Sequence, residues 1–117
     1  MRAILTYHSI DPSGSPISLS PSAFDRHVRW FRSGRVRVLT LDDLVAAPDD
    51  EHAVAITFDD GFVNFGDVAA PRLADAGVPS TLFVVSDHVG RTNAWHGVVT
   101  PGIPDLPLLG WDALRRL

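Results

Sequence analysis

Two adjacent carboxylates, Asp59 and Asp60, are the residues of this sequence that are best placed to do chemistry. They follow an apolar run over residues 53–56 that is typical of a buried strand, and Gly61 comes directly after them. Carboxylate oxygens at the end of a strand can bind a divalent cation and can take a proton from a bound water molecule. A plain turn is the alternative, because Asp-Gly is a common turn dipeptide. The buried strand favours a site, since two neighbouring like charges are costly unless a cation neutralises them.

The elements that must position these carboxylates alternate between strand and helix patterns. Apolar runs predict strands at residues 3–6, 36–40, 53–58 and 80–85. Helical spacing and capping residues predict helices that begin near Ser20 or Ser22, over 41–47, over 63–76 with a break at Pro71, and from Trp111 onward. Strands separated by helices form parallel β-α units, so the sequence predicts an α/β fold with a parallel sheet.

The predicted strand ends carry further polar side chains, namely Tyr7, His8, Thr40, Ser86, Asp87 and His88. Ligands of such folds bind at the C-terminal ends of the strands, so we expect these side chains to gather there with Asp59 and Asp60. For His8, a partly buried histidine bonded to a backbone carbonyl is the alternative interpretation.

The remaining histidines have no spacing that indicates a metal site. His27 falls on the apolar face of a predicted helix with Val28 and is expected to be a packing residue. His88 and His96 lack the i, i+4 spacing by which one helix presents two ligands. Residues 91–109 are rich in Pro and Gly and predict a long loop.

Composition narrows the classes of function. A chain of 117 residues with 45% apolar residues corresponds to a single globular domain. Its net charge of −4 gives no electrostatic footprint for nucleic acid, and the absence of cysteine excludes disulfides, thiolate metal ligands and a cysteine nucleophile. No apolar run approaches the length of a membrane span, and the first residues show no signal-peptide pattern.

The residues Thr57-Phe58-Asp59-Asp60-Gly61 resemble the first motif of the polysaccharide deacetylases, the NodB homology domain of carbohydrate esterase family 4. The similarity extends over most of the chain, through residues 5–10, 24–44, 71–84 and 109–114.

The resemblance implies a distorted, TIM-like (β/α) barrel and a hydrolase that acts on carbon–nitrogen bonds other than peptide bonds. Such an enzyme removes acetyl groups from N-acetylated sugars or polysaccharides and uses a divalent metal, usually zinc. By position, Asp59 is expected to be the general base and Asp60 a metal ligand. Tyr7, His8 and Ser86 are expected to line the pocket.

The resemblance also implies that residues 1–117 form only the N-terminal portion of the domain. The family's two metal-binding histidines belong to a His-x-x-x-His motif that would follow Leu117, and the sequence contains no such motif. We therefore expect the chain alone to bind zinc weakly or not at all and to be inactive. A catalytically inactive carbohydrate-binding or interaction module derived from the same fold is the alternative. Members of the family often act at the cell envelope or outside the cell, and the sequence itself assigns no location.

Overall fold

A parallel β-sheet forms the centre of the fold in the computed structural model, which describes all residues from 1 to 117. Its central strand is β5 (Ala53–Phe58), and β1 (Arg2–Tyr7) pairs with the whole length of β5. The short strands β4 (Arg37–Val38) and β6 (Thr81–Leu82) also pair with β5 and run parallel to it. The predicted α/β fold with four parallel strands is therefore confirmed.

β4 and β6 share one edge of β5, and this arrangement explains why both are short. β4 pairs with Ala53 and Val54 at the start of β5, whereas β6 pairs with Thr57 and Phe58 at its end. Because β1 occupies the opposite edge, each of the two has only part of one edge available. The strands predicted at residues 36–40 and 80–85 have the correct position and direction, but both are longer than the observed β4 and β6.

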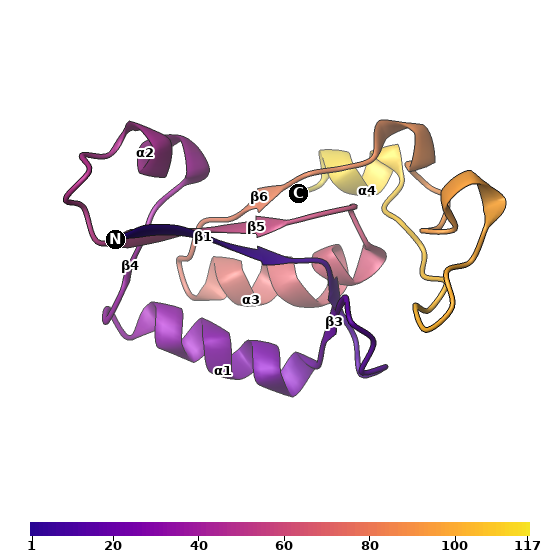
Figure 1. Cartoon of the computed structure of the whole chain (residues 1–117), viewed down its shortest axis with the longest axis horizontal. Helices are drawn as coiled ribbons and strands as arrows, with labels where there is room; N and C mark the ends of the chain where they lie inside the picture. Colours follow the sequence, from indigo (N-terminus) through magenta and orange to yellow (C-terminus); the bar gives the residue numbers. More distant parts are fainter.

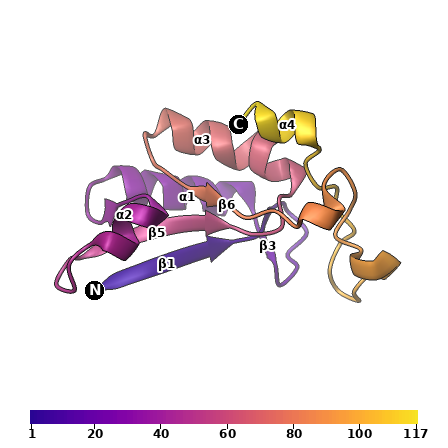
Figure 2. The same ribbon diagram turned by 90° about the horizontal axis from the view of Figure 1, so that it is seen from above.

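Helices cover both faces of this sheet (Figure 1, Figure 2). α1 (Pro21–Arg32) and α3 (Ala70–Asp75) lie on one face, and α2 (Leu41–Ala46) lies on the other. The helices include no candidate membrane span.

The side chains of β5 alternate between these two faces. Ile56 and Phe58 belong to the main core with residues of α1 and α3, while Ala53 and Ala55 pack against Leu44 of α2. Every residue of β5 is buried. A ligand can therefore reach this strand only beyond its ends.

α1 begins and packs as its sequence predicts. The Ser20 hydroxyl accepts a hydrogen bond from the Ala23 N–H, and proline follows as the first helical residue. Phe24, Val28 and Phe31 are buried against the sheet. The prediction for His27 is wrong, because this residue lies at the flank of the buried face and is exposed.

The predicted break at Pro71 is confirmed. A π-helical turn, η1 (Phe65–Ala69), precedes α3, and the Ala70 N–H donates to the Phe65 carbonyl. Proline has no N–H to donate, and here it lies in the first turn of a new α-helix, where no donor is needed.

The chain after β6 is irregular but ordered by hydrogen bonds. It forms two 3₁₀ turns, η2 (Ser86–His88) and η3 (Trp95–Gly97), before α4 (Trp111–Arg115). The buried side chain of Asn93 donates to the Pro104 carbonyl and accepts from the Leu106 N–H. The side chain of Asn93 thus links the two ends of a segment that the sequence predicts only as a long loop.

A small second sheet joins β2 (Ser9–Ile10) and β3 (Ser18–Leu19) beside the end of β1. The Asp11 carboxylate holds the connection between them, because it accepts hydrogen bonds from the Ser9 and Ser18 hydroxyls and from the Ser13 N–H. Burial alone would raise the pKa of Asp11, but these hydrogen bonds outweigh it and lower the pKa to about 2.

Replacing Asp11 by Asn should destabilise the chain by roughly 1 kcal/mol at pH 7, since charged hydrogen bonds are lost at a partly exposed site. The folded-state pKa lies below the ordinary value of 3.8, so the stabilisation is present above that value and is lost as the pH falls towards 2. Urea unfolding at pH 7, 4 and 2.5 measures this, with the exposed Asp50→Asn as the control. An equal difference between wild type and D11N at pH 7 and at pH 2.5 would contradict the assignment.

Candidate active site

The register of β1 and β5 brings His8 and Asp59 together. Tyr7 and Phe58 are paired residues, so the two strands end at the same level. The Asp59 N–H continues the ladder by donating to the Tyr7 carbonyl at 2.9 Å. His8 and Asp59 therefore follow the strand ends side by side, with 3.8 Å between His8 Nε2 and Asp59 Oδ2. Both side chains are more than a third exposed, so solvent and a substrate can reach them.

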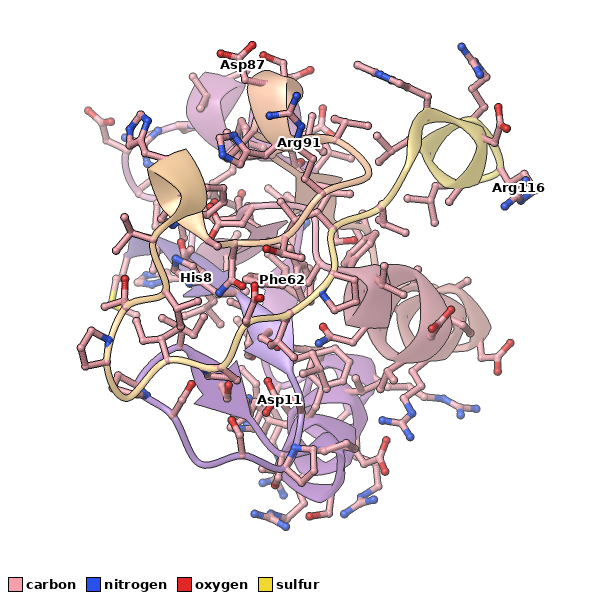
Figure 3. All side chains as sticks on the ribbon, turned by 90° about the vertical axis from the view of Figure 1, so that its right-hand side faces the viewer. His8, Asp11, Phe62, Asp87, Arg91 and Arg116 are labelled. Carbon is pink, nitrogen blue, oxygen red and sulfur yellow. The ribbon has the colours of Figure 1, made fainter.

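The next two residues form a tight turn in the left-handed region of backbone conformation. Asp60 has a φ of 74° and Gly61 a φ of 78°. A Cβ atom added to Gly61 would lie 3.0 Å from the Val84 side chain, so the turn requires glycine for space as well as for conformation. Positive φ is uncommon for a residue with a side chain, and such strain concentrates at functional sites. The chain then enters η1 rather than a hairpin, and Phe62, which directly follows the turn, is fully buried. Figure 3 shows Phe62 near the centre of the view, between His8 and the segment of α3.

Electrostatics at this turn disfavour a second negative charge. Partial burial raises the pKa of the Asp60 carboxyl, the nearby charge of Asp59 raises it further, and His8 acts in the opposite direction. A cation bound beside these carboxylates would relieve both unfavourable contributions.

Tyr7 contributes its ring to the core and its hydroxyl to the surface. The ring stacks on Phe58 at 5.2 Å between centroids and meets Phe24 edge-on at 5.6 Å. The hydroxyl lies 2.8 Å from His27 Nδ1, and burial raises the pKa of Tyr7 to about 12, so the phenol stays protonated at neutral pH. Tyr7, His8 and His27 line one pocket of about 190 Å³.

His27 is the pocket residue that sequence reasoning missed. Its position at the flank of the apolar face of α1, one residue before Val28, was the available signal. An imidazole at such a flank can reach over the helix edge to a polar group, and here that group is the Tyr7 hydroxyl.

Other predicted residues lie elsewhere. Ser86 is exposed in η2 and does not line the pocket of Tyr7 and His8. Thr40 caps α2, because β4 ends level with the start of β5 rather than with its end. Asp87 and His88 line a different pocket together with His96.

Three potential metal-binding side chains lie near one another at this turn, namely those of Asp59, Asp60 and His8. No group of three His, Cys, Asp or Glu residues in residues 1–117 is arranged to hold an ion. Structural and catalytic zinc sites take at least three protein ligands. These three side chains therefore do not form such a site in this structure.

Replacing Asp60 by Asn should stabilise the metal-free chain at pH 7 by roughly 0.5 kcal/mol, allowing for solvent screening. Asparagine accepts the left-handed conformation and removes a carboxylate whose folded-state pKa is raised. This difference in stability between D60N and wild type should vanish in acid, because the wild-type carboxyl is then protonated in both the folded and the unfolded chain. Urea unfolding with a chelator at pH 7 and pH 3 tests this, and the exposed Asp67→Asn is the matched control. Destabilisation of D60N at pH 7 would show that the Asp60 charge is favourably paired.

Comparison with known proteins places this geometry in a family. The sequence profile of the polysaccharide deacetylase family matches residues 46–117. YxkH of Bacillus subtilis (strain 168), whose name assigns it to the polysaccharide deacetylases, is 33% identical over 93 residues, which cover 75% of this chain and 33% of YxkH. A poly-beta-1,6-N-acetyl-D-glucosamine N-deacetylase of Staphylococcus aureus (strain MSSA476) is 30% identical over 80 residues, which cover 65% of this chain and 28% of that enzyme.

Solved structures share the fold. IcaB from Ammonifex degensii superposes with a TM-score of 0.77 at 22% identity, over 98% of this chain and 47% of IcaB. A de-N-acetylase from Aggregatibacter actinomycetemcomitans gives a TM-score of 0.72 at 22% identity, over 98% of this chain and 49% of that chain. The chain thus spans about a third of these curated relatives and about half of these solved structures.

The matched profile includes β5 and the turn with Asp59, Asp60 and Gly61, and the fold agrees over nearly the whole chain. The chain belongs to the polysaccharide deacetylase family.

Proposed function

We propose that residues 1–117 are the N-terminal portion of a metal-dependent hydrolase domain that removes acetyl groups from N-acetylated carbohydrates. The observation that carries this proposal is the placement of Asp59 and Asp60 on a strained turn directly beyond the paired ends of β1 and β5. Family membership and the N-deacetylase relative support the reaction class.

Asp59 is the proposed general base. Its carboxylate is partly exposed and lies 3.8 Å from His8, and its backbone is fixed by the hydrogen bond to Tyr7. In the proposed reaction, Asp59 accepts a proton from the water that attacks the acetamide carbon. The carbon–nitrogen bond then breaks, and the leaving amine takes up a proton to give acetate and a free amino sugar.

Asp60 is the proposed metal ligand. Its partial burial and the adjacent charge of Asp59 make its ionised form unfavourable without a counter-charge. The proposed metal is zinc. Because no group of three ligands forms within residues 1–117, its remaining ligands are proposed to come from the His-x-x-x-His motif that the family resemblance implies.

An unpaired strand edge supports the proposal that this sheet continues into a larger barrel. β1 pairs with β5 alone, so its outer edge is free. On the face that α2 only partly covers, Ile4 of β1 is 52% exposed and borders a pocket of about 520 Å³ with Leu44 and Val45. Free strand edges and exposed apolar residues are normally covered in complete domains. The solved relatives, about twice the length of this chain, have the additional residues that such a barrel needs.

The test is acetate release from N-acetylglucosamine oligomers with added zinc or cobalt. We expect none from residues 1–117 and metal-dependent turnover from a longer form that carries the His-x-x-x-His motif. Comparable turnover by both forms would place all the metal ligands within this chain and overturn the domain proposal. Saccharide binding without turnover by the longer form would instead support an inactive binding module.

Two substitutions in the longer form separate the proposed roles. Asp59→Asn should lower kcat by about 10²–10⁴, the usual contribution of a general base, and leave the metal content unchanged. Asp60→Asn should weaken metal binding, measured by dialysis against a chelator and metal analysis. The exposed Asp67→Asn is the matched control. Equal metal loss in D59N and D60N would show that the two roles are wrongly divided.

A further inference from the structure

A second pocket lies at the same end of the sheet as the candidate active site. It has a volume of about 640 Å³, within the range of ligand sites, and its lining includes Asp87, His88, Arg91, Thr92 and His96. Figure 3 looks onto the C-terminal ends of β1 and β5 and shows Asp87 and Arg91 close together at one side of this end.

Backbone hydrogen bonds tie this pocket to the turn that carries Asp59 and Asp60. The Leu109 N–H donates to the Gly61 carbonyl at 2.8 Å, and the Leu109 carbonyl accepts from the Gly90 N–H at 2.9 Å. The Leu108 N–H donates to the Arg91 carbonyl at 2.8 Å. The position of Arg91 is therefore fixed relative to the turn through two consecutive residues of the chain.

The polar side chains of the pocket have unused hydrogen-bonding capacity. The side chains of Asp87 and Arg91 form no ion pair or hydrogen bond with each other or with any other residue of the chain. His88 Nδ1 is buried without a partner, and its ring meets Trp95 edge-on at 4.9 Å between centroids. Buried polar atoms in proteins nearly always have a partner, so this ring would gain a hydrogen bond if a bound ligand or water displaced the atoms that cover Nδ1.

The mixture of groups favours a neutral polyhydroxyl ligand over an ion. Arg91 only donates, the Asp87 carboxylate only accepts, and imidazoles do either, as sugar hydroxyls do. Asp87 and Arg91 bring one negative and one positive charge to the pocket, so an ion of either sign meets one repulsive group, and the chain has no group of three ligands for a metal.

We propose that this pocket binds a sugar unit of the polysaccharide, adjacent along the polymer to the unit whose acetamide reaches Asp59. The inference rests on the proposed function and adds a specificity site to it. Contacts to a neighbouring unit would let the enzyme distinguish a polymer from a single sugar.

Trp95 provides a local probe of this pocket. Replacing the exposed Trp30 and Trp111 by Phe leaves Trp95 as the only tryptophan, in contact with His88. Residues 1–117 in this form are titrated with the tetramer of β-1,4-linked N-acetylglucosamine, with its β-1,6-linked counterpart, and separately with inorganic phosphate. We expect a saturable change in Trp95 emission with at least one tetramer and none with phosphate.

Two variants test the residues, with one matched control. Arg91→Ala should weaken tetramer binding at least about tenfold, because a hydrogen bond to a charged group is lost. His96→Gly should also weaken it without harming the fold, since His96 has a φ of 56° that glycine adopts freely. Arg116→Ala removes the same charge from an exposed residue that follows the last residue of α4. Figure 3 shows Arg116 away from Arg91, so this variant should leave binding unchanged.

The outcomes separate this inference from the proposed function. Three results would overturn the sugar site, whether or not the longer form releases acetate. They are no Trp95 response to either tetramer, a response to phosphate alone, and tetramer binding that R91A and H96G leave unchanged. In the active longer form, R91A should raise KM for the tetramer relative to that for a single N-acetylated sugar and leave kcat nearly unchanged. A further combination is a Trp95 response that depends on Arg91 while the longer form releases no acetate. That combination would support the sugar site and contradict the deacetylase proposal.

Discussion

The parallel pairing of β1 with β5 sets both the main core and the geometry of the candidate active site. All six residues of β5 are paired with β1 and buried. Asp59 is therefore the first residue after β5 whose side chain reaches solvent, and the register of the two strands places His8 next to it. A shift of one residue would turn Ile56 and Phe58 out of the main core and would separate His8 from Asp59. The aromatic contacts of Phe58 with Tyr7, Phe24 and Phe65 therefore hold both the core and the site in register.

The turn after β5 combines two unfavourable features, and a proposed function explains both. Asp60 has a strained backbone and a partly buried carboxylate beside another acid, which lowers stability in the absence of a cation. The surrounding structure holds it there: Phe62 is fully buried, the Val84 side chain occupies the space that a Cβ atom of residue 61 would need, and the Gly61 carbonyl accepts a hydrogen bond from Leu109. Stability supplied by these neighbours allows a site to keep a geometry that suits binding better than folding.

The segment between β6 and α4 connects the site to a second surface. Its conformation depends on single polar contacts, such as those of Asn93, rather than on a helix or a strand. Because Leu108 and Leu109 bridge the Gly61 turn and residues 90–91, a change in this segment would alter the pocket of Arg91 and the environment of Asp60 together.

The parallel α/β fold, the break at Pro71 and the placement of Asp59 and Asp60 after a buried strand can be read from the sequence, because these depend on local periodicity and on chain connectivity. The sharing of one edge of β5 by β4 and β6, which shortens both and leaves Thr40 away from the site, arises only when the strands pack together. The tertiary structure also brings His27 to Tyr7 and lets Asn93 close an irregular segment, since both contacts join residues more than ten positions apart. No local pattern encodes such pairings, which arise when separate elements pack against one another.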